Sequence, residues 1–163
     1  MKKFFALVAV ILIACSTFAG CAQSNDPPAG TDDNTSTETE QEEITKMYIT
    51  INGNKLEVTL ADNAAAAALA EKLKKGDITY TADDYGGFEK VGRLGFSLPS
   101  DDTEITTQSG DVILYSGNQI VLFYGSNTWD YTRLGTIDGY SSSELRTLLG
   151  AGKGSVQVVL SLA

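Results

Sequence analysis

Hydrophobic and polar residues alternate in two neighbouring segments of the chain, residues 47–51 and residues 55–60. The dipeptide Asn52-Gly53 lies between them. Such alternation is typical of strands with one buried face, and Asn-Gly favours the positive φ angles of a tight turn. The pattern therefore predicts an antiparallel hairpin over residues 47–60.

Residues 64–75 change to a helical pattern. Asp62 precedes them at the position of an N-cap, and Gly76 follows them as a helix stop. The apolar residues fall on one narrow stripe of mostly small side chains, which are Ala65, Ala66, Leu69, Ala70 and Leu73. Because small side chains allow close approach, we expect this helix to pack tightly on a sheet or barrel.

After this helix the pattern returns to short apolar or alternating runs, which Gly, Asp, Asn and Ser separate. These runs are residues 77–81, 88–94, 111–115, 119–124, 134–137 and 155–162. Gly117-Asn118 lies between two of the runs and predicts a second tight hairpin. We interpret each run as a strand.

A second, short helix is expected over residues 142–149. Ser141 and Glu144 have the spacing of a capping box at its start, and Gly150 ends it. Its apolar face consists of Leu145, Leu148 and Leu149. The total is then about eight strands and two helices, and the strands do not alternate regularly with helices. This order argues against a doubly wound parallel sheet and favours a mainly antiparallel barrel whose open ends the helices cover.

The first twenty residues have the composition of an export signal. Lys2 and Lys3 precede an apolar run over residues 4–14, which is too short to cross a bilayer as a helix. Residues 18–21, Phe-Ala-Gly-Cys, resemble the bacterial lipobox. That resemblance implies cleavage after residue 20 and a diacylglycerol, with acyl chains such as palmitate, on Cys21. The alternative is an ordinary secretory signal that leaves Cys21 as a free thiol.

Residues 21–43 are expected to form a disordered, acidic spacer, because they contain no large apolar residue that could be buried. A single domain should follow over residues 44–163. Beyond Met47 the chain has 14 acidic residues and nine Lys and Arg, a net charge near −5. This charge argues against a nucleic-acid or anionic-membrane surface. The only other cysteine, Cys15, lies in the signal, so no intramolecular disulfide is expected.

The order of the predicted elements resembles the bacterial cyclophilin-like domain family. The resemblance rests on the first hairpin, the Ala-rich helix, residues 110–115, Gly117-Asn118, and residues 134–139 followed by a helix. It covers the chain from Met47 to Ala163. It implies a closed, eight-stranded, antiparallel-rich β-barrel with two short helices.

Activity does not follow from such a fold. The prolyl isomerases that the family resembles use an arginine in a groove of aromatic residues, Gln and His, and this chain has no histidine. Arg93 is the nearest candidate for that arginine, with Phe96 close by in the sequence. The alternative interpretation of Arg93 is a solvated residue at the end of a strand.

The composition excludes several kinds of chemistry. Without histidine, and without cysteine beyond Cys21, the domain cannot assemble a Ser-His-Asp or Cys-His system or a zinc or copper site of the usual kind. Asp83-Asp84 and residues 101–104 could bind a hard cation such as calcium, but neither has the spacing of an EF-hand. We therefore expect no metal and no cofactor.

The only tryptophan of the chain lies in a Gly, Ser and Asn-rich segment, residues 124–133. Aromatic and polar side chains on a loop suit a ligand surface, because the ring stacks and the polar groups orient the ligand. We expect the ligand-binding residues to be Asn127, Trp129, Tyr131, Arg133 and Arg93, with Tyr85, Phe88 and Tyr115 as further candidates. The alternative is that Trp129 or Tyr131 folds back as a plug over the barrel end.

These features favour a lipid-anchored domain outside the cytoplasmic membrane that binds a small ligand, a peptide or an envelope protein. We expect a non-catalytic binding domain. The alternative is a weak peptidyl-prolyl isomerase that uses Arg93.

Overall fold

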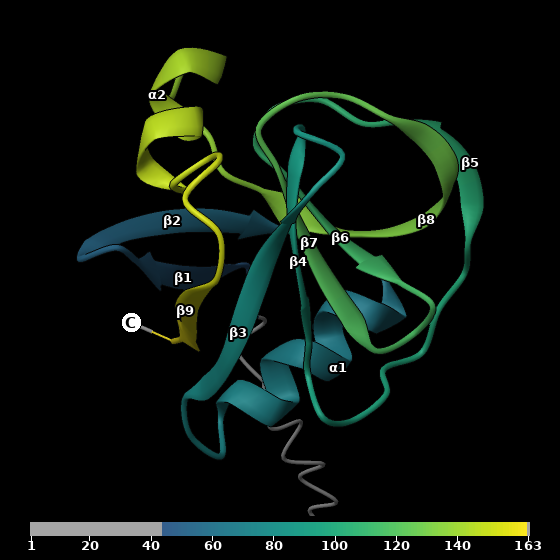
Figure 1. Ribbon diagram of the computed structural model, residues 1–163. Helices are drawn as coiled ribbons and strands as arrows, with labels where there is room; N and C mark the ends of the chain where they lie inside the picture. Colours follow the sequence, from purple (N-terminus) through teal and green to yellow (C-terminus); the bar gives the residue numbers. More distant parts are fainter. Residues whose placement is uncertain (1–43, 163) are drawn as a thin grey trace, which may run out of the picture. The chain divides into compact units, whose positions relative to one another are not determined.

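The computed structural model describes residues 44–162, and in this part of the chain nine strands and two helices follow one another. The first half contains β1 (Lys46–Ile51), β2 (Asn54–Leu60), α1 (Ala64–Leu73), β3 (Ile78–Tyr85) and β4 (Glu89–Arg93). The second half contains β5 (Thr103–Thr106), β6 (Asp111–Tyr115), β7 (Gln119–Phe123), β8 (Thr128–Thr136), α2 (Ser142–Leu148) and β9 (Val156–Ser161). Figure 1 shows their arrangement. The predicted signal and spacer, including Cys21, lie outside the described residues.

All strand pairs are antiparallel, and the strand order is β2-β1-β9-β3-β4-β7-β6-β8-β5. β2 also pairs with β8, so eight of the strands form a ring of pairings. The ninth strand, β5, pairs with β8. The prediction of a mainly β, antiparallel-rich fold with two helices is confirmed, and the sheet has one strand more than the eight expected.

Side chains alternate between the two faces of the strands, and one face carries the main hydrophobic cluster. Both helices belong to this cluster. The whole predicted stripe of α1 is buried, and Leu145 and Leu149 are buried at α2. In Figure 1, α1 lies at the lower end of the strands and α2 at the upper left.

The helix ends follow the capping rules with one correction. Asn63, and not the predicted Asp62, is the N-cap of α1, and its side chain accepts a hydrogen bond from the Ala66 N–H at 2.9 Å. The Asn63 amide also donates to the Arg133 carbonyl oxygen at 2.7 Å, which ties α1 to β8. At α2 the predicted capping box of Ser141 and Glu144 is present.

Both predicted hairpins are confirmed. Asn52 and Gly53 have φ angles of 51° and 77° between β1 and β2, as the Asn-Gly pair predicted. The second hairpin joins β6 to β7, and its positive φ angles are at Ser116 and Gly117. The turn therefore begins one residue earlier than the Gly117-Asn118 pair suggested.

Two strands differ from the prediction. β8 extends from Thr128 to Thr136, although residues 124–133 were expected to be a loop with a strand only over residues 134–137. β5 was not expected, and it pairs with the first half of β8. β3 also continues beyond residue 81 to Tyr85, so Asp83 and Asp84 are strand residues.

A lysine is fully buried among the residues of the main cluster. Lys90 in β4 forms an ion pair with Asp84 at 2.9 Å, and its Nζ donates to the Gly154 carbonyl oxygen at 2.6 Å. The Tyr124 hydroxyl and the Gly154 N–H donate to the two oxygens of Asp84. A buried charge is costly unless it is paired in this way. The network therefore joins β3 and β4 to the segment before β9.

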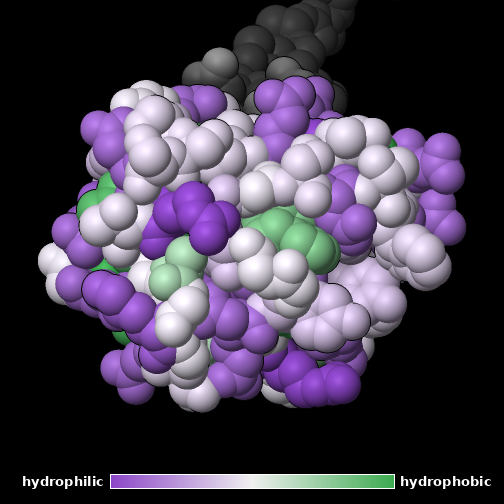
Figure 2. All heavy atoms as spheres, turned by 45° about the horizontal axis from the view of Figure 1, so that its top comes forward, coloured by the Kyte–Doolittle hydropathy of each residue, from purple (hydrophilic) through white to green (hydrophobic). Residues whose placement is uncertain are grey.

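The surface is polar over most of the face drawn in Figure 2, where hydrophobic residues form small separate patches among hydrophilic ones. Within residues 44–162, neither helix has the length and apolar content that crossing a membrane requires.

Candidate functional site

A cleft of about 370 Å³ opens on the face of the sheet opposite to the main hydrophobic cluster. Five strands, β3, β4, β6, β7 and β8, and the residue before β8 contribute to it. Its lining residues are Tyr85, Glu89, Val91, Tyr115, Gln119, Val121, Asn127, Trp129 and Tyr131. We call this feature the aromatic cleft, because four of the nine residues are Tyr or Trp.

Strand register brings the lining residues together. The paired positions are Tyr85 with Glu89, Val91 with Val121, and Tyr115 with Gln119. Neighbours along each strand alternate between faces. The intervening residues, such as Lys90 and Leu122, therefore point into the main cluster while the lining residues face the cleft. Side chains distant in the sequence thus form one continuous surface.

A second, smaller hydrophobic cluster supports the cleft. Ile113, Val121, Phe123 and Tyr131 are its buried members. The Tyr131 ring packs edge-on against both Tyr115 and Phe123, with ring centroids 5.8 Å apart in each pair. Edge-to-face packing of aromatic rings stabilises their orientation. The apolar wall of the cleft is therefore formed before any ligand arrives.

Hydrogen bonds fix the polar residue Asn127. The Thr107 N–H donates to the Asn127 carbonyl oxygen at 2.8 Å, and the buried Thr107 hydroxyl oxygen accepts from the Asn127 N–H at 3.0 Å. The Asn127 side-chain amide then donates to the Tyr131 hydroxyl at 2.9 Å. This chain of contacts holds Asn127 and the Tyr131 ring in fixed positions at the edge of the cleft.

Two aromatic side chains of the cleft are exposed. Trp129 has 57% of its surface accessible, and Tyr85 has 66%. The interpretation of Trp129 as a buried plug is therefore wrong, since its side chain faces solvent where β8 pairs with β5. Tyr131 is buried against the sheet in the second cluster.

Glu89 is the acidic group of the cleft. It is only 5% exposed, and its Oε2 atom has no hydrogen-bond partner among the described residues. Burial disfavours the charged form and raises the pKa of Glu89 to about 7. A carboxyl group with a raised pKa inside a cleft is typical of binding and catalytic sites.

Arg93 and Phe96 do not share a cavity. Arg93 is exposed and lines a neighbouring hollow that shares Val91 and Gln119 with the aromatic cleft. Phe96 packs partly against the main cluster, and the Lys72 ammonium lies 5.0 Å from its ring centroid. The structure therefore does not bring together the arginine and the aromatic ring proposed for an isomerase.

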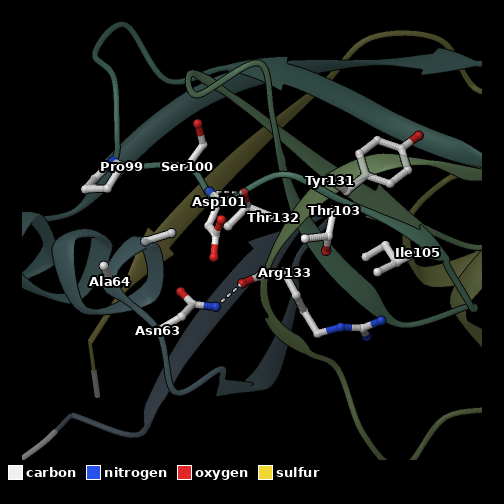
Figure 3. A pocket seen from close by; sticks show the side chains of 11 residues that line it. Asn63, Ala64, Pro99, Ser100, Asp101, Thr103, Ile105, Tyr131, Thr132 and Arg133 are labelled. Atoms are coloured by element: carbon white, nitrogen blue, oxygen red, sulfur yellow. Dashed lines mark hydrogen bonds between the residues drawn. The ribbon is translucent and has the colours of Figure 1, made fainter. Parts of the chain in front are cut away.

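Arg133 lies farther along β8 and does not line the aromatic cleft. It forms an ion pair with the buried carboxylate of Asp111, whose other oxygen accepts a hydrogen bond from the Gln108 N–H at 2.8 Å. Arg133 lines a cavity of about 300 Å³ beside α1, shown in Figure 3. In that view the Tyr131 ring points away from Asn63 and Asp101 at the other side of the cavity. Of the five predicted ligand residues, the aromatic cleft contains Asn127, Trp129 and Tyr131.

The acidic pairs considered for calcium have other roles. Asp84 is part of the Lys90 network, and Asp102 accepts a hydrogen bond from the Thr132 hydroxyl at 2.6 Å. Over the described part of the chain, no three or more acidic side chains are grouped in a way that could hold a metal ion.

The sequence model of the cyclophilin-like family matches residues 49–161. The chain belongs to the cyclophilin-like family. It is also similar to the solution structure of a hypothetical protein from Archaeoglobus fulgidus, with 18% sequence identity and a TM-score of 0.55. That match covers 73% of this chain and 95% of the archaeal chain. No curated protein matches this cyclophilin-like chain.

Membership of the cyclophilin-like family confirms the predicted resemblance, and it assigns no activity. The aromatic cleft therefore has to be interpreted from its own residues. Sequence reasoning named Tyr85 and Tyr115 as further candidates, and both line the cleft. It missed Glu89 and Gln119. The signal for Glu89 was present in the alternation of residues 88–94, which puts Glu89 on the same face as Val91, opposite the face of Lys90.

Proposed function

We propose that this chain is a non-catalytic binding domain, and that the aromatic cleft is its ligand site. The observation that carries the proposal is the pair of exposed aromatic side chains, Tyr85 and Trp129, at a cleft whose other lining residues are buried or partly buried. Large aromatic side chains stabilise a fold when they are buried. Exposed ones that border a concave surface are typical of ligand sites.

The size and composition of the cleft support a small, partly apolar ligand. A volume of about 370 Å³ lies at the lower end of the range of small-molecule sites. Val91 and Val121 provide apolar contacts, while Gln119 and Asn127 provide amide groups that can orient a ligand through hydrogen bonds. A folded protein surface would be too large to enter this cleft, so a peptide or envelope protein would insert a single side chain.

In the same proposal, the ring of eight paired strands is a closed β-barrel, and the domain is displayed outside the cytoplasmic membrane. The lipobox-like residues 18–21 support attachment of a diacylglycerol to Cys21, and the acidic segment up to residue 43 supports a spacer between lipid and domain. A lipid anchor of this kind keeps a binding domain at the membrane without a transmembrane helix.

The anchor is tested by expressing the full chain and Cys21→Ser in a bacterium that processes lipoproteins. We expect the wild-type chain in the detergent phase after phase partitioning, with a mass that includes a diacylglycerol on Cys21. The serine variant should lack this mass, because the hydroxyl does not replace the thiol in the thioether. A wild-type chain with a free thiol at Cys21 would contradict the anchor.

The ligand site is tested with the full chain in a non-ionic detergent, using the emission of Trp129, the only tryptophan. Simple glycans, Xaa-Pro dipeptides, small amines and small alcohols are titrated in turn. We expect a saturable change with one class, and a weakening of about fivefold in Tyr85→Ala, since stacking on one ring contributes roughly 1 kcal/mol.

The matched control is Tyr140→Ala, another exposed tyrosine that does not line the cleft. This variant should bind as the wild type does. If no class changes the emission, or if both tyrosine variants bind equally well, the cleft is not the ligand site. Acceleration of Xaa-Pro isomerisation that is lost in Arg93→Ala would instead support the alternative function.

A further inference from the structure

We infer that the ligand of the aromatic cleft is an organic cation, an ammonium group on a small apolar body, and that the Glu89 carboxylate is its counter-ion. This inference rests on the proposed function, because it names the ligand class of the same site. It is carried by one buried, unpartnered carboxyl oxygen in a cleft lined by four aromatic rings.

Glu89 is a buried acidic residue of the cleft. Its side chain lines the cleft and is 5% exposed, and within residues 44–162 nothing donates a hydrogen bond to its Oε2 atom. A buried carboxylate without a partner is unfavourable, so its presence requires an explanation. A cation bound in the cleft would stabilise the charge of this carboxylate.

Glu89 differs from two other shielded carboxylates of the domain, Asp84 and Asp111. Asp84 is paired with Lys90 at 2.9 Å, and Asp111 is paired with Arg133. Each of them has its cation within the fold. The nine residues that line the aromatic cleft include neither Lys nor Arg, so Glu89 lacks this internal compensation.

Four aromatic residues line the same cleft as Glu89. The faces of Tyr and Trp rings attract cations, and the attraction increases when water is excluded. Tyr85, Tyr115, Trp129 and Tyr131 come from three different strands and line the cleft that Glu89 also lines. A carboxylate combined with several aromatic faces recognises an ammonium group better than it recognises a neutral or an anionic one.

The pH dependence of binding distinguishes a cation from a neutral ligand. Burial raises the pKa of Glu89 to about 7. The side chain therefore loses its proton as the pH rises through neutrality. The other titratable side chains that line the cleft are Tyr85 on β3, Tyr115 on β6 and Tyr131 on β8. Behind it, Tyr124 after β7 belongs to the main cluster, and the Arg146 guanidinium of α2 lies 5.1 Å from the Tyr124 ring. Burial raises the pKa of Tyr131 and of Tyr124, which keeps both side chains neutral around pH 7. Glu89, with a pKa of about 7, is the group to which a change of binding near neutral pH is assigned.

The experiment compares choline with its neutral isostere 3,3-dimethylbutan-1-ol, which has the same shape without the charge. Both are titrated into the full chain in non-ionic detergent, with Trp129 emission as the readout, from about pH 5 to about pH 9. We expect choline to bind about tenfold more tightly than the alcohol above pH 7, and its affinity to rise with pH as Glu89 ionises. The affinity of the alcohol should not rise.

Two variants test whether the Glu89 carboxylate is the group that attracts choline. Glu89→Gln removes the carboxylate, and Glu104→Gln removes an exposed carboxylate on β5 that does not line the cleft. We expect choline binding to weaken about tenfold in the first variant and to stay unchanged in the second, while the alcohol binds equally to both. The pH profile of the wild-type chain gives an independent reading if Glu89→Gln does not fold.

The outcomes separate this inference from the proposed function. Equal affinities for choline and the alcohol would overturn the cation and leave the cleft as a ligand site. Affinity that rises as the pH falls would mean that protonated Glu89 donates to a neutral acceptor, which also overturns it. Failure of both probes overturns the cation inference, and the wider titration with glycans and dipeptides then decides the proposed function.

Discussion

Two adjacent residues of β4, Glu89 and Lys90, are both buried and have opposite surroundings. Lys90 points into the main cluster, where it is paired with Asp84. Burial alone would raise the pKa of Asp84, but the hydrogen bonds from Lys90, Tyr124 and the backbone lower it to about 2. Glu89 points to the opposite face, where burial raises its pKa to about 7 without compensation. The fold thus stabilises one buried charge and leaves the other available for a ligand.

The raised pKa of Glu89 predicts a loss of stability with rising pH. In the unfolded chain a glutamate ionises near 4.5, while in the folded chain Glu89 ionises near 7. Between these values the folded state binds more protons, so the free energy of unfolding falls as the pH rises and reaches its lower value above pH 7. We expect Glu89→Gln to lack this decline. Its stability relative to wild type should increase by roughly 2 to 3 kcal/mol between about pH 4.5 and about pH 8.

Chemical denaturation at several pH values measures this difference. Glu104→Gln is again the control, because Glu104 is exposed on β5 and its stability curve should follow that of the wild type. Parallel curves for wild type and Glu89→Gln would mean that Glu89 ionises with an ordinary pKa. The inference about a buried counter-ion would then lose its physical basis.

At the scale of the elements, the sequence predicts those whose own residues determine them. The hairpin of β1 and β2 follows from its alternation and the Asn-Gly turn, and the buried face of α1 follows from its apolar stripe. The capping box of Ser141 and Glu144 specifies the start of α2 in the same way. In each case the signal and the structure lie within a few residues of each other.

The elements that were missed depend on partners far away in the sequence. β5 has four residues, and only one of them is apolar and partly buried. It forms a strand because it pairs with β8, which provides its hydrogen bonds. β8 begins in a polar segment whose strand conformation is determined by β5 and β6. Glu89 was missed for the same reason. In the sequence, Glu89 is an acidic residue next to a turn, and most such residues are solvated. Only the folded structure shows that Tyr85 and Val91 line the same cleft.

At the scale of the whole domain, the pairing of β2 with β8 joins strands that are otherwise separated by the full ring. The contact is short and consists of Thr59 with Thr136 and Leu60 with Gly135. The Ala61 N–H donates to the Leu134 carbonyl oxygen at 2.9 Å beside it. Gly135 is fully enclosed here, because a Cβ atom at this position would overlap the Thr59 carbonyl oxygen and approach the Val58 side chain to 2.9 Å.

This close approach predicts the effect of a single methyl group. Gly135→Ala would force β2 and β8 apart, and we expect a loss of about 2 kcal/mol in the free energy of unfolding, as for other overpacked sites. The loss should be local at first, so the Ala61 amide should exchange hydrogen faster while the Leu122 amide, in the centre of the sheet, stays protected. The control is Thr136→Ala, which removes atoms at the neighbouring position. In this variant the Ala61 and Leu122 amides should exchange as they do in the wild type. Wild-type stability in Gly135→Ala would mean that the β2–β8 pairing contributes little, and that the eight strands behave as an open sheet.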